Sequence, residues 1–318
     1  MRVLSLFDGM SCGMLALQRV GIPVEAYYAS EIDKYAIQVS QKNFPEIFHI
    51  WDITKINRDF FINDRWIDLI IWWSPCQWFS FAGKQLNFDD PRSKLFFEYV
   101  RILKEMKPKY FLLENVRMKK EYQDIISENL FWVQPIEINS ALVSAQNRRR
   151  LYRVGERQED GSYKQVHIDQ PKDKLIFLKD ILLPETYTEF DKSYALTASY
   201  NGAVLWNSIE KSQRTMVRNK PIRVWTFWKW WQWQRVYDID WKSVTLSAQW
   251  WWRGAKTWLY LIKDYARKLE PIECERLQNV PDNYTEWVSK TNRRKILGNW
   301  WTVDVIAHIF SFIKNPLQ

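Results

Sequence analysis

The chain has 318 residues, a formal net charge of +9 and a pI near 9.3. Its length suits one large domain with an insertion or two unequal domains, and its positive charge predicts a polyanionic partner. Three scattered cysteines do not suit a disulfide framework or a CxxC zinc site, and no apolar run is as long as a membrane span. We therefore expect a cytoplasmic protein that binds neither a metal nor a membrane.

The first half of the chain alternates strand-like and helical patterns. Short apolar segments predict five strands, at Val3–Phe7, Ala26–Ser30, Phe48–Ile50, Asp68–Ile71 and Tyr110–Glu114. Helical stretches lie between them, and within 94–107, for example, apolar residues recur at helical spacing. This alternation predicts an α/β fold with a parallel, doubly wound sheet, whose ligands bind at the carboxyl ends of the strands.

Three of the predicted strand ends carry residues suited to a nucleoside cofactor. The loop Asp8–Gly13 follows the first strand and opens a helix, where small residues let a cofactor approach the backbone. Glu31 ends the second strand, placed to accept hydrogen bonds from ribose hydroxyls, and Asp52 ends the third, placed to accept one from an adenine amino group. For either acid alone a surface cap is the simpler interpretation, but the row of three predicts a cofactor pocket.

The next two strand ends carry candidate catalytic residues. Cys76 follows the fourth strand in Ser74-Pro75-Cys76-Gln77, and a partly exposed thiolate near positive charge is a nucleophile. Glu114 ends the fifth strand, where a buried carboxyl could stay protonated and donate a hydrogen bond. Arg148 and Arg150 are two residues apart, so they share one face of an extended segment. One of them can face the pocket as a fixed donor to a carbonyl or phosphate.

Tryptophan usage is abnormal, with 20 tryptophans and only 9 glycines. The excess gathers where turns favour glycine, as in Trp72-Trp73, Trp230-Trp231 and Trp250-Trp251-Trp252. A surface that stacks single-stranded nucleic acid would also use tryptophan, but it does not explain Trp51, Trp66 or Trp300. We hypothesise that most of these positions are glycine in the organism, because UGA is read as glycine in some genetic codes and as tryptophan in others. Ordinary UGG codons at Trp72, Trp73 and Trp250 would contradict this hypothesis.

The character of the chain changes after about residue 160, where β-type segments dominate. Every charge between Glu210 and Asp238 is positive, and this basic run includes Arg214, Arg218, Arg223, Lys229 and Arg235. A solvated basic face is one interpretation, but the length of the run without an acid favours a surface that follows phosphates. From about Pro271 the pattern is helical again.

Taken in order, these motifs resemble those of the DNA (cytosine-5)-methyltransferases of bacterial or phage type. The matching residues are Phe7-Asp8-Gly9, Glu31, Asp52, Ser74-Pro75-Cys76-Gln77, Glu114-Asn115-Val116, Gln146 with Arg148 and Arg150, Arg276-Leu277-Gln278 with Pro281, and Gly298-Asn299. The match spans nearly the whole chain. It implies a Rossmann-like S-adenosylmethionine-dependent methyltransferase fold, a mostly parallel sheet flanked by helices, with a smaller β-rich target-recognition domain. The implied boundaries are 1–160 and 271–318 for the catalytic domain and 161–270 for the recognition domain.

The resemblance also implies an activity and a role for each matched residue. The enzyme would transfer a methyl group from S-adenosyl-L-methionine to C5 of a cytosine flipped out of double-stranded DNA. Cys76 would attack C6, Glu114 would hold N3 and the exocyclic amine, Arg150 would contact O2, and Arg148 would support the site. The implied cofactor contacts are Phe7, Asp8, Gly9, Ser11, Glu31, Asp52, Ile53, Pro75 and Asn299. The expected DNA contacts are Gln77, Ser80, Lys84, Arg92 and Gln146, together with Arg214, Arg218, Arg223, Lys229 and Arg235 of the basic run.

The resemblance sharpens the hypothesis about tryptophan. The family expects glycine at Trp51, Trp72, Trp73, Trp78 and Trp300, and usually around Trp250-Trp251-Trp252, whereas Trp301 is tolerated. Genuine tryptophans would lie in left-handed turns or against the cofactor, and such a chain should misfold or lose activity. The alternatives are a tRNA-directed enzyme and a catalytically impaired DNA-binding module. We expect a monomer in a bacterial or phage-infected cell, near the nucleoid, with a cognate restriction endonuclease as a possible companion.

Overall fold

The computed structural model describes residues 1–50, 52–61, 66–73, 94–184, 186–188, 190–209, 211–219, 225–226, 235–236 and 266–313. Several residues named above lie outside the described residues: Trp51, Pro75, Cys76, Gln77, Trp78, Ser80, Lys84, Arg92, Arg223, Lys229 and Trp250-Trp251-Trp252. No helix in the described part of the chain is long and apolar enough to cross a membrane.

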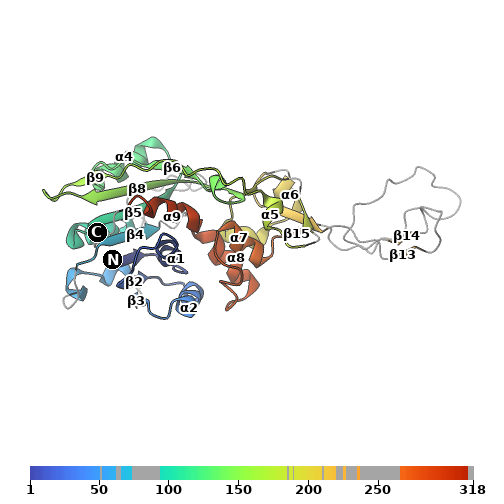
Figure 1. The fold of residues 1–318 in the computed structure, drawn as a ribbon, viewed down its shortest axis with the longest axis horizontal. Helices are drawn as coiled ribbons and strands as arrows, with labels where there is room; N and C mark the ends of the chain where they lie inside the picture. The colour runs from blue at the N-terminus through green and yellow to red at the C-terminus, as the bar shows by residue number, and fades with distance from the viewer. Residues whose placement is uncertain are drawn as a thin grey trace.

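A large sheet with the strand order β3-β2-β1-β4-β5-β8-β6 forms the centre of the protein, and β9 pairs with β8 (Figure 1). Its parallel part consists of β1 (Arg2–Leu6), β2 (Ala26–Ser30), β3 (Phe48–Ile50), β4 (Leu69–Trp73) and β5 (Tyr110–Val116). Strand β8 (Arg149–Arg157) runs antiparallel to β5, β6 (Ile136–Asn139) and β9 (Tyr163–Gln165). The five predicted strands are confirmed, and their ends differ from the prediction by at most two residues.

The central strands are apolar on both faces because helices cover both faces. Every residue of β1 and of β4 is buried. Alternate residues enter two separate cores: Val3, Ile71 and Trp73 belong to the first core, and Leu4 and Trp72 belong to the second.

Helices from both ends of the chain build the first core. Figure 1 shows α1 (Cys12–Arg19) and α9 (Val303–Phe310) close together beside the sheet, although they come from opposite ends of the chain. Helices α3 (Lys94–Met106) and α4 (Lys120–Asn129) supply residues of the second core. Three further helices are α2 (Lys34–Asn43), α7 (Pro271–Leu277) and α8 (Lys290–Asn299).

The segment between β9 and α7 forms smaller elements. A three-stranded sheet has the order β10-β12-β15, β11 pairs with β7, and β13 pairs with β14. These elements are β10 (Thr186–Tyr187), β11 (Ser193–Tyr194), β12 (Met216–Asn219), β13 (Trp225–Thr226), β14 (Arg235–Val236), β15 (Ala266–Lys268), α5 (Leu178–Ile181) and α6 (Leu205–Ile209), whereas β7 (Gln146–Asn147) precedes β8 in the chain. In Figure 1, α5, α6 and β15 lie beyond one end of the large sheet. Strand β9 extends the large sheet past residue 160. The domain boundaries at residues 160 and 270 stay a prediction.

Short 3-10 helices complete the described chain. They are η1 (Ile53–Lys55), η2 (Arg58–Phe61), η3 (Ser140–Leu142) and η4 (Ala198–Gly202). Two of them begin at a polar side chain that caps the first turn: Asp52 accepts a hydrogen bond from the amide of Thr54, and Asn139 accepts one from the amide of Ala141.

Candidate active site

The carboxyl ends of β1, β4 and β5 lie side by side, as the parallel order requires. Leu6 of β1 pairs with Trp72 of β4, and Trp73 pairs with Glu114 of β5. The loop that begins at Phe7, the segment that leads to Cys76 and the Glu114 carboxyl therefore start from neighbouring points of one sheet edge. The sequence predicted that these residues lie at one edge of the sheet, and the strand register shows their order along that edge: β1, β4 and then β5.

The first loop is held by Glu31. One oxygen of this carboxylate accepts a hydrogen bond from the Gly9 amide at 2.9 Å, and the other accepts from the amides of Ile32 and Asp33, each at 2.8 Å. Burial raises the pKa of Glu31, and the three amide donors oppose that rise. Gly9 has a φ of 64°, a left-handed conformation that glycine adopts without steric cost. Glu31 therefore holds the backbone of the first loop in place through its hydrogen bond with the Gly9 amide.

Asp8 and Ser11 are also bonded inside the loop. The Asp8 carboxylate accepts hydrogen bonds from the Ser11 hydroxyl at 2.5 Å and from the Tyr27 hydroxyl at 2.7 Å. Both Asp8 and Ser11 are buried, and burial raises the pKa of Asp8. Their predicted contact with the cofactor stays a prediction, and in this structure their polar atoms fix the loop.

The remaining described cofactor candidates occupy different surroundings. Asp52 accepts hydrogen bonds from the Thr54 amide and hydroxyl at 2.9 and 2.8 Å, and these bonds lower its pKa. It is therefore a cap, the simpler of its two interpretations. Ile53 is buried, Phe7 is half-buried with its ring centroid 5.6 Å from that of Trp72, and Asn299 is the last residue of α8.

Glu114 is a buried carboxyl with a raised pKa. Only 1% of the residue is exposed, and the Nε of Arg150 lies 3.0 Å from its Oε1. Burial raises the pKa of Glu114 from 4.5 to about 7, although the charges of Arg150 and Arg148 oppose the rise. A carboxyl with this pKa is present in both protonation states near neutral pH, so it can donate or accept a hydrogen bond there.

The free energy of unfolding should therefore depend on pH through Glu114. A carboxyl that titrates at 4.5 when unfolded and near 7 when folded holds more protons in the folded state, so stability falls as pH rises through that window. At about 1.4 kcal/mol per pH unit the loss approaches about 3 kcal/mol. We expect Glu114→Gln to remove this loss when urea unfolding is compared at pH 4.5 and pH 8. Glu128→Gln, at an exposed residue of α4, should retain it; equal slopes in both variants would contradict the assignment.

Arg148 and Gln146 lie inside the protein and join three parts of the chain. Arg148 is 2% exposed and donates a hydrogen bond to the Leu196 carbonyl at 2.7 Å. Gln146 is fully buried: its side-chain nitrogen donates to the Leu277 carbonyl at 2.8 Å and to the Gln278 side chain at 2.9 Å, and its oxygen accepts from the Leu196 amide at 3.1 Å. The predicted contact of Gln146 with DNA is not tested, but in this conformation its amide faces the interior.

The basic run is only partly described. Arg214 donates hydrogen bonds to the Ser199 hydroxyl at 3.0 Å and to the Gly202 carbonyl at 3.4 Å. Arg218 lies in β12 and Arg235 in β14. Their role in DNA binding stays a prediction.

Arg153 of β8 was not among the predicted site residues. Its side chain is fully buried and donates to the Gln123 carbonyl at 2.9 Å, to the Ser127 hydroxyl at 3.3 Å and to the Asn115 side chain at 3.4 Å. Burial lowers its pKa to about 10. It ties α4 to the residue that follows Glu114. The one signal for it in the sequence is an arginine inside an apolar strand.

The tryptophans at strand β4 and after α8 are packed inside the protein. Trp72 lies among Phe7, Phe96 and Tyr99 in the second core, whereas the Trp73 ring contacts the Trp300 ring at a centroid distance of 4.3 Å. None of these three tryptophans has a left-handed backbone, whereas Trp300 lies against Gly9 of the loop that is expected to approach the cofactor. At a strand position, glycine is required where the surroundings leave no room for a side chain, and not because of the backbone conformation. Trp132, with a φ of 62° and 64% exposure, does have a left-handed backbone.

This packing tests the fit of S-adenosylmethionine. A Cβ atom built on Gly9 would lie 1.9 Å from Cζ2 of Trp300, so the indole lies directly against the loop that is expected to approach the cofactor. Glu31, Gly9 and Asp52 occupy the expected strand ends, but the two indoles fill the adjoining space. The residues as they stand do not fit the cofactor at that point.

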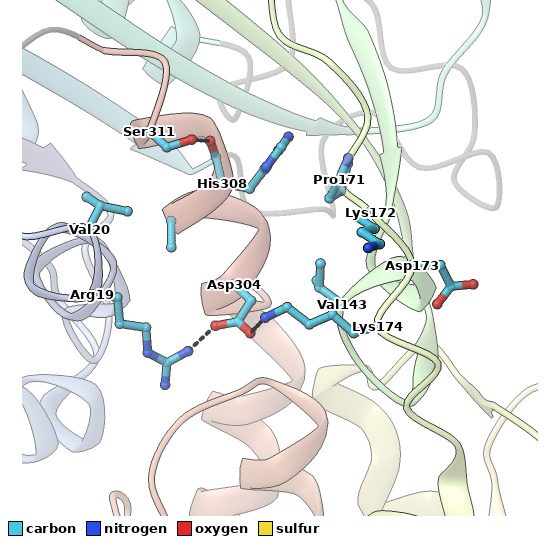
Figure 2. Close-up of a pocket in the computed structure, with 11 residues that line it drawn as sticks. Arg19, Val20, Val143, Pro171, Lys172, Asp173, Lys174, Asp304, His308 and Ser311 are labelled. Atoms are coloured by element: carbon cyan, nitrogen blue, oxygen red, sulfur yellow. Dashed lines mark hydrogen bonds and ion pairs between the residues drawn. The ribbon is translucent and has the colours of Figure 1, made fainter.

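A separate surface pocket of about 820 Å³ lies between α1, α9 and the segment 171–174 (Figure 2). Asp304 stands at its centre, ion-paired with Arg19 on one side and with Lys174 at 2.7 Å on the other. No residue predicted to act on cofactor or base lines it. No group of three or more potential metal ligands occurs within the described ranges.

The strand order, with one antiparallel strand next to β5, and the row of polar groups at the carboxyl ends define an S-adenosylmethionine-dependent methyltransferase fold. Solved structures support this class. A methyltransferase of Entamoeba histolytica, EhMeth, matches with a TM-score of 0.67 and 16% identity, covering 100% of this chain and 98% of that one. The Dnmt2 methyltransferase of S. pombe matches with a TM-score of 0.63 and 19% identity, covering 100% and 99%.

Sequence comparison identifies the family within this class. A family model described as C-5 cytosine-specific DNA methylase matches residues 1–315. Type II methyltransferase M.HhaI of Haemophilus parahaemolyticus is 32% identical over 328 residues, which cover 100% of this chain and 95% of that relative. Type II methyltransferase M1.ScrFI of Lactococcus lactis subsp. cremoris is 32% identical over 333 residues, covering 100% and 79%. The chain belongs to the C-5 cytosine-specific DNA methylase family, and the predicted resemblance is confirmed.

Proposed function

We propose that this chain methylates C5 of cytosine in double-stranded DNA with Cys76, Glu114 and Arg150 as its catalytic residues. Family membership establishes the reaction class, and S-adenosylmethionine supplies the methyl group. The observation that carries the residue roles is the buried Glu114 carboxyl, ion-paired with Arg150 at the end of β5. Its neighbour in the register, Trp73, is the third residue before Cys76. The tRNA-directed alternative is not favoured, because the family model that matches residues 1–315 is described as a C-5 cytosine-specific DNA methylase.

The base-side chemistry follows from the charges that these residues provide. The Cys76 thiolate forms a bond to C6 of the cytosine, and the electron pair of the C5–C6 double bond moves into the ring. Negative charge grows at N3 and O2. Glu114 in its protonated form donates a hydrogen bond to N3, and the Arg150 guanidinium donates to O2. C5 then carries enough electron density to accept a methyl group, which a bound S-adenosylmethionine would supply. A solvent base takes the C5 proton, and the C5–H electron pair re-forms the C5–C6 double bond as the C6–sulfur bond breaks, which restores the ring and the thiolate.

Arg150 has a second effect, on Glu114 itself. Its charge opposes the rise in the pKa of Glu114 that burial causes, and the resulting pKa is about 7. The pair can therefore give a proton to N3 in one half of the reaction and take it back in the other. A buried carboxyl without the arginine would lose this reversibility.

We further propose that a monomer suffices, because Gly9, Glu31, Glu114 and Arg150 all come from one chain. Residues 161–270 would select the DNA sequence, and the basic run would follow the phosphate backbone. A cognate restriction endonuclease and a location at the nucleoid of a bacterial or phage-infected cell complete the proposal. The name Type II methyltransferase shared by M.HhaI and M1.ScrFI supports the endonuclease.

Cys76→Ala tests the nucleophile. In a chain with glycine at the family's glycine positions, we expect methylation of a random duplex library in the presence of S-adenosylmethionine, read by bisulfite sequencing. The Cys76→Ala variant of that chain should show no methylation, because no other group can form the bond to C6. Cys12→Ala serves as the matched control, since Cys12 is buried in α1 and burial raises the pKa of its thiol far above neutrality. Persistent methylation by Cys76→Ala would contradict the assignment.

A further inference from the structure

Two indole rings join the first loop to the catalytic carboxyl. The Trp300 ring supplies all three of the atoms nearest to a Cβ built on Gly9, at 1.9 to 2.2 Å. The same ring contacts Trp73 at a centroid distance of 4.3 Å and an interplanar angle of 44°. Trp73 pairs with Glu114 in the β4–β5 register, and its indole N–H is among the groups that lower the pKa of Glu114. The contacts form a continuous row: Gly9, Trp300, Trp73, Glu114.

This row crosses the space that the reaction needs. If the proposed function holds, the methyl donor lies against the first loop and the cytosine lies against Glu114, and the two must meet between them. A methyl transfer requires reacting atoms about 3–3.5 Å apart. Two indoles in contact between donor and acceptor exclude such an approach.

Among the described residues, no acceptor receives a hydrogen bond from the buried Trp300 N–H, and the same holds for the N–H groups of Trp73 and Trp301. Each such donor loses about 1–3 kcal/mol. Gly9 opposite it has left-handed backbone and no side chain, the features of a loop that another group approaches closely. A small residue at position 300 would expose that face of Gly9.

We propose that Trp73 and Trp300 together form a plug at the methyl-donor end of the cofactor site, and that glycine at both positions is required for S-adenosylmethionine to bind. Trp72 is not part of the plug, because its ring lies in the second core on the opposite face of the sheet. Trp301 is buried like Trp300, with each 5% exposed, but no atom of Trp301 is among the three nearest to Gly9. The inference rests on the proposed function and names the two residues that decide whether this chain can carry it out.

The test measures cofactor binding in the full-length chain without DNA. Isothermal titration with S-adenosylmethionine and with S-adenosylhomocysteine would compare the chain as it stands, Trp73→Gly, Trp300→Gly and the double variant. We expect the double variant to bind at least a hundred-fold more tightly than the chain as it stands. Each single variant should gain at most ten-fold, because one ring remains in the row. Trp301→Gly is the matched control, with no gain in affinity.

Several results would overturn the plug. They are equal affinities of the unsubstituted chain and the double variant, an equal gain in Trp301→Gly, or tryptophan at position 300 in peptides of active enzyme purified from its source. If the double variant fails to fold, the peptide measurement decides: glycine at 73 and 300 supports the plug, and tryptophan overturns it. Tighter cofactor binding by the double variant supports the plug whether or not that variant methylates cytosine. The chain with glycine at all of the family's glycine positions tests the proposed function: binding of the cofactor without methylation of cytosine by that chain would contradict the function and leave the plug intact, so the two failures are distinguishable.

Discussion

Replacement of Glu114 by alanine should lower the rate of methyl transfer by about 10²- to 10⁴-fold, the usual contribution of a positioned acid or base. The parent would be the chain with glycine at all of the family's glycine positions. The Glu114 carboxyl is 1% exposed and lies 3.0 Å from the Arg150 Nε. In the alanine variant, a water molecule could replace the carboxyl at N3 only if it entered this buried position beside Arg150. Affinity for duplex DNA should change little, because the backbone contacts that dominate affinity lie elsewhere.

Glu114→Gln separates charge from hydrogen bonding in this prediction. The amide can donate to N3 at any pH but cannot transfer a proton, so its rate should fall less than that of Glu114→Ala. The pH dependence attributable to a group with a pKa of about 7 should disappear from its profile. Single-turnover rates between pH 5.5 and 8.5 would measure both effects, with Glu128→Ala as the control at an exposed site. An alanine variant within ten-fold of its parent at every pH would refute the role of Glu114.

Gln146→Ala should reduce the free energy of unfolding by about 3–5 kcal/mol, the range for breaking a buried polar network. The Gln146 side chain is the shared partner of the Leu277 carbonyl, the Gln278 side chain, the Thr302 hydroxyl and the Leu196 amide. Alanine would leave these groups buried without that partner and would add a cavity.

The measurement for Gln146→Ala is urea-induced unfolding followed by intrinsic fluorescence and circular dichroism. Asn147→Ala is the matched control, because Asn147 is the exposed neighbour in β7 and should change stability by less than about 0.5 kcal/mol. A loss below about 1 kcal/mol in Gln146→Ala would show that the network contributes little.

The alternation of strands and helices was enough to predict the fold. Buried parallel strands are short and apolar on both faces, so their pattern does not depend on distant contacts. Glu31 and Glu114 could be placed at strand ends for the same reason. The sequence pattern did not predict that β8 lies next to β5 and antiparallel to it. The position of β8 depends on which edge of the sheet is free when β8 folds.

The surroundings of side chains that depend on long-range contacts could not be predicted from the sequence. Gln146 was expected at the DNA surface; in this conformation its amide faces the interior, where its partners Leu277 and Leu196 come from segments 131 and 50 residues away. Arg153 gave no periodic signal of its own. By contrast, Trp300 was suspected from composition and motif position, but its contact with Gly9 depends on how α8 returns to the first loop.

The pairing of α1 with α9 has a consequence for how the protein is made. Arg19 of α1 is ion-paired with Asp304 of α9, a contact between residues 285 positions apart, and the two helices share the first core. A nascent chain lacks α9 until residues 303–310 have left the ribosome, so the apolar residues of the first core that α9 covers stay exposed until then. A chain truncated before Val303 would keep that apolar surface exposed and should aggregate.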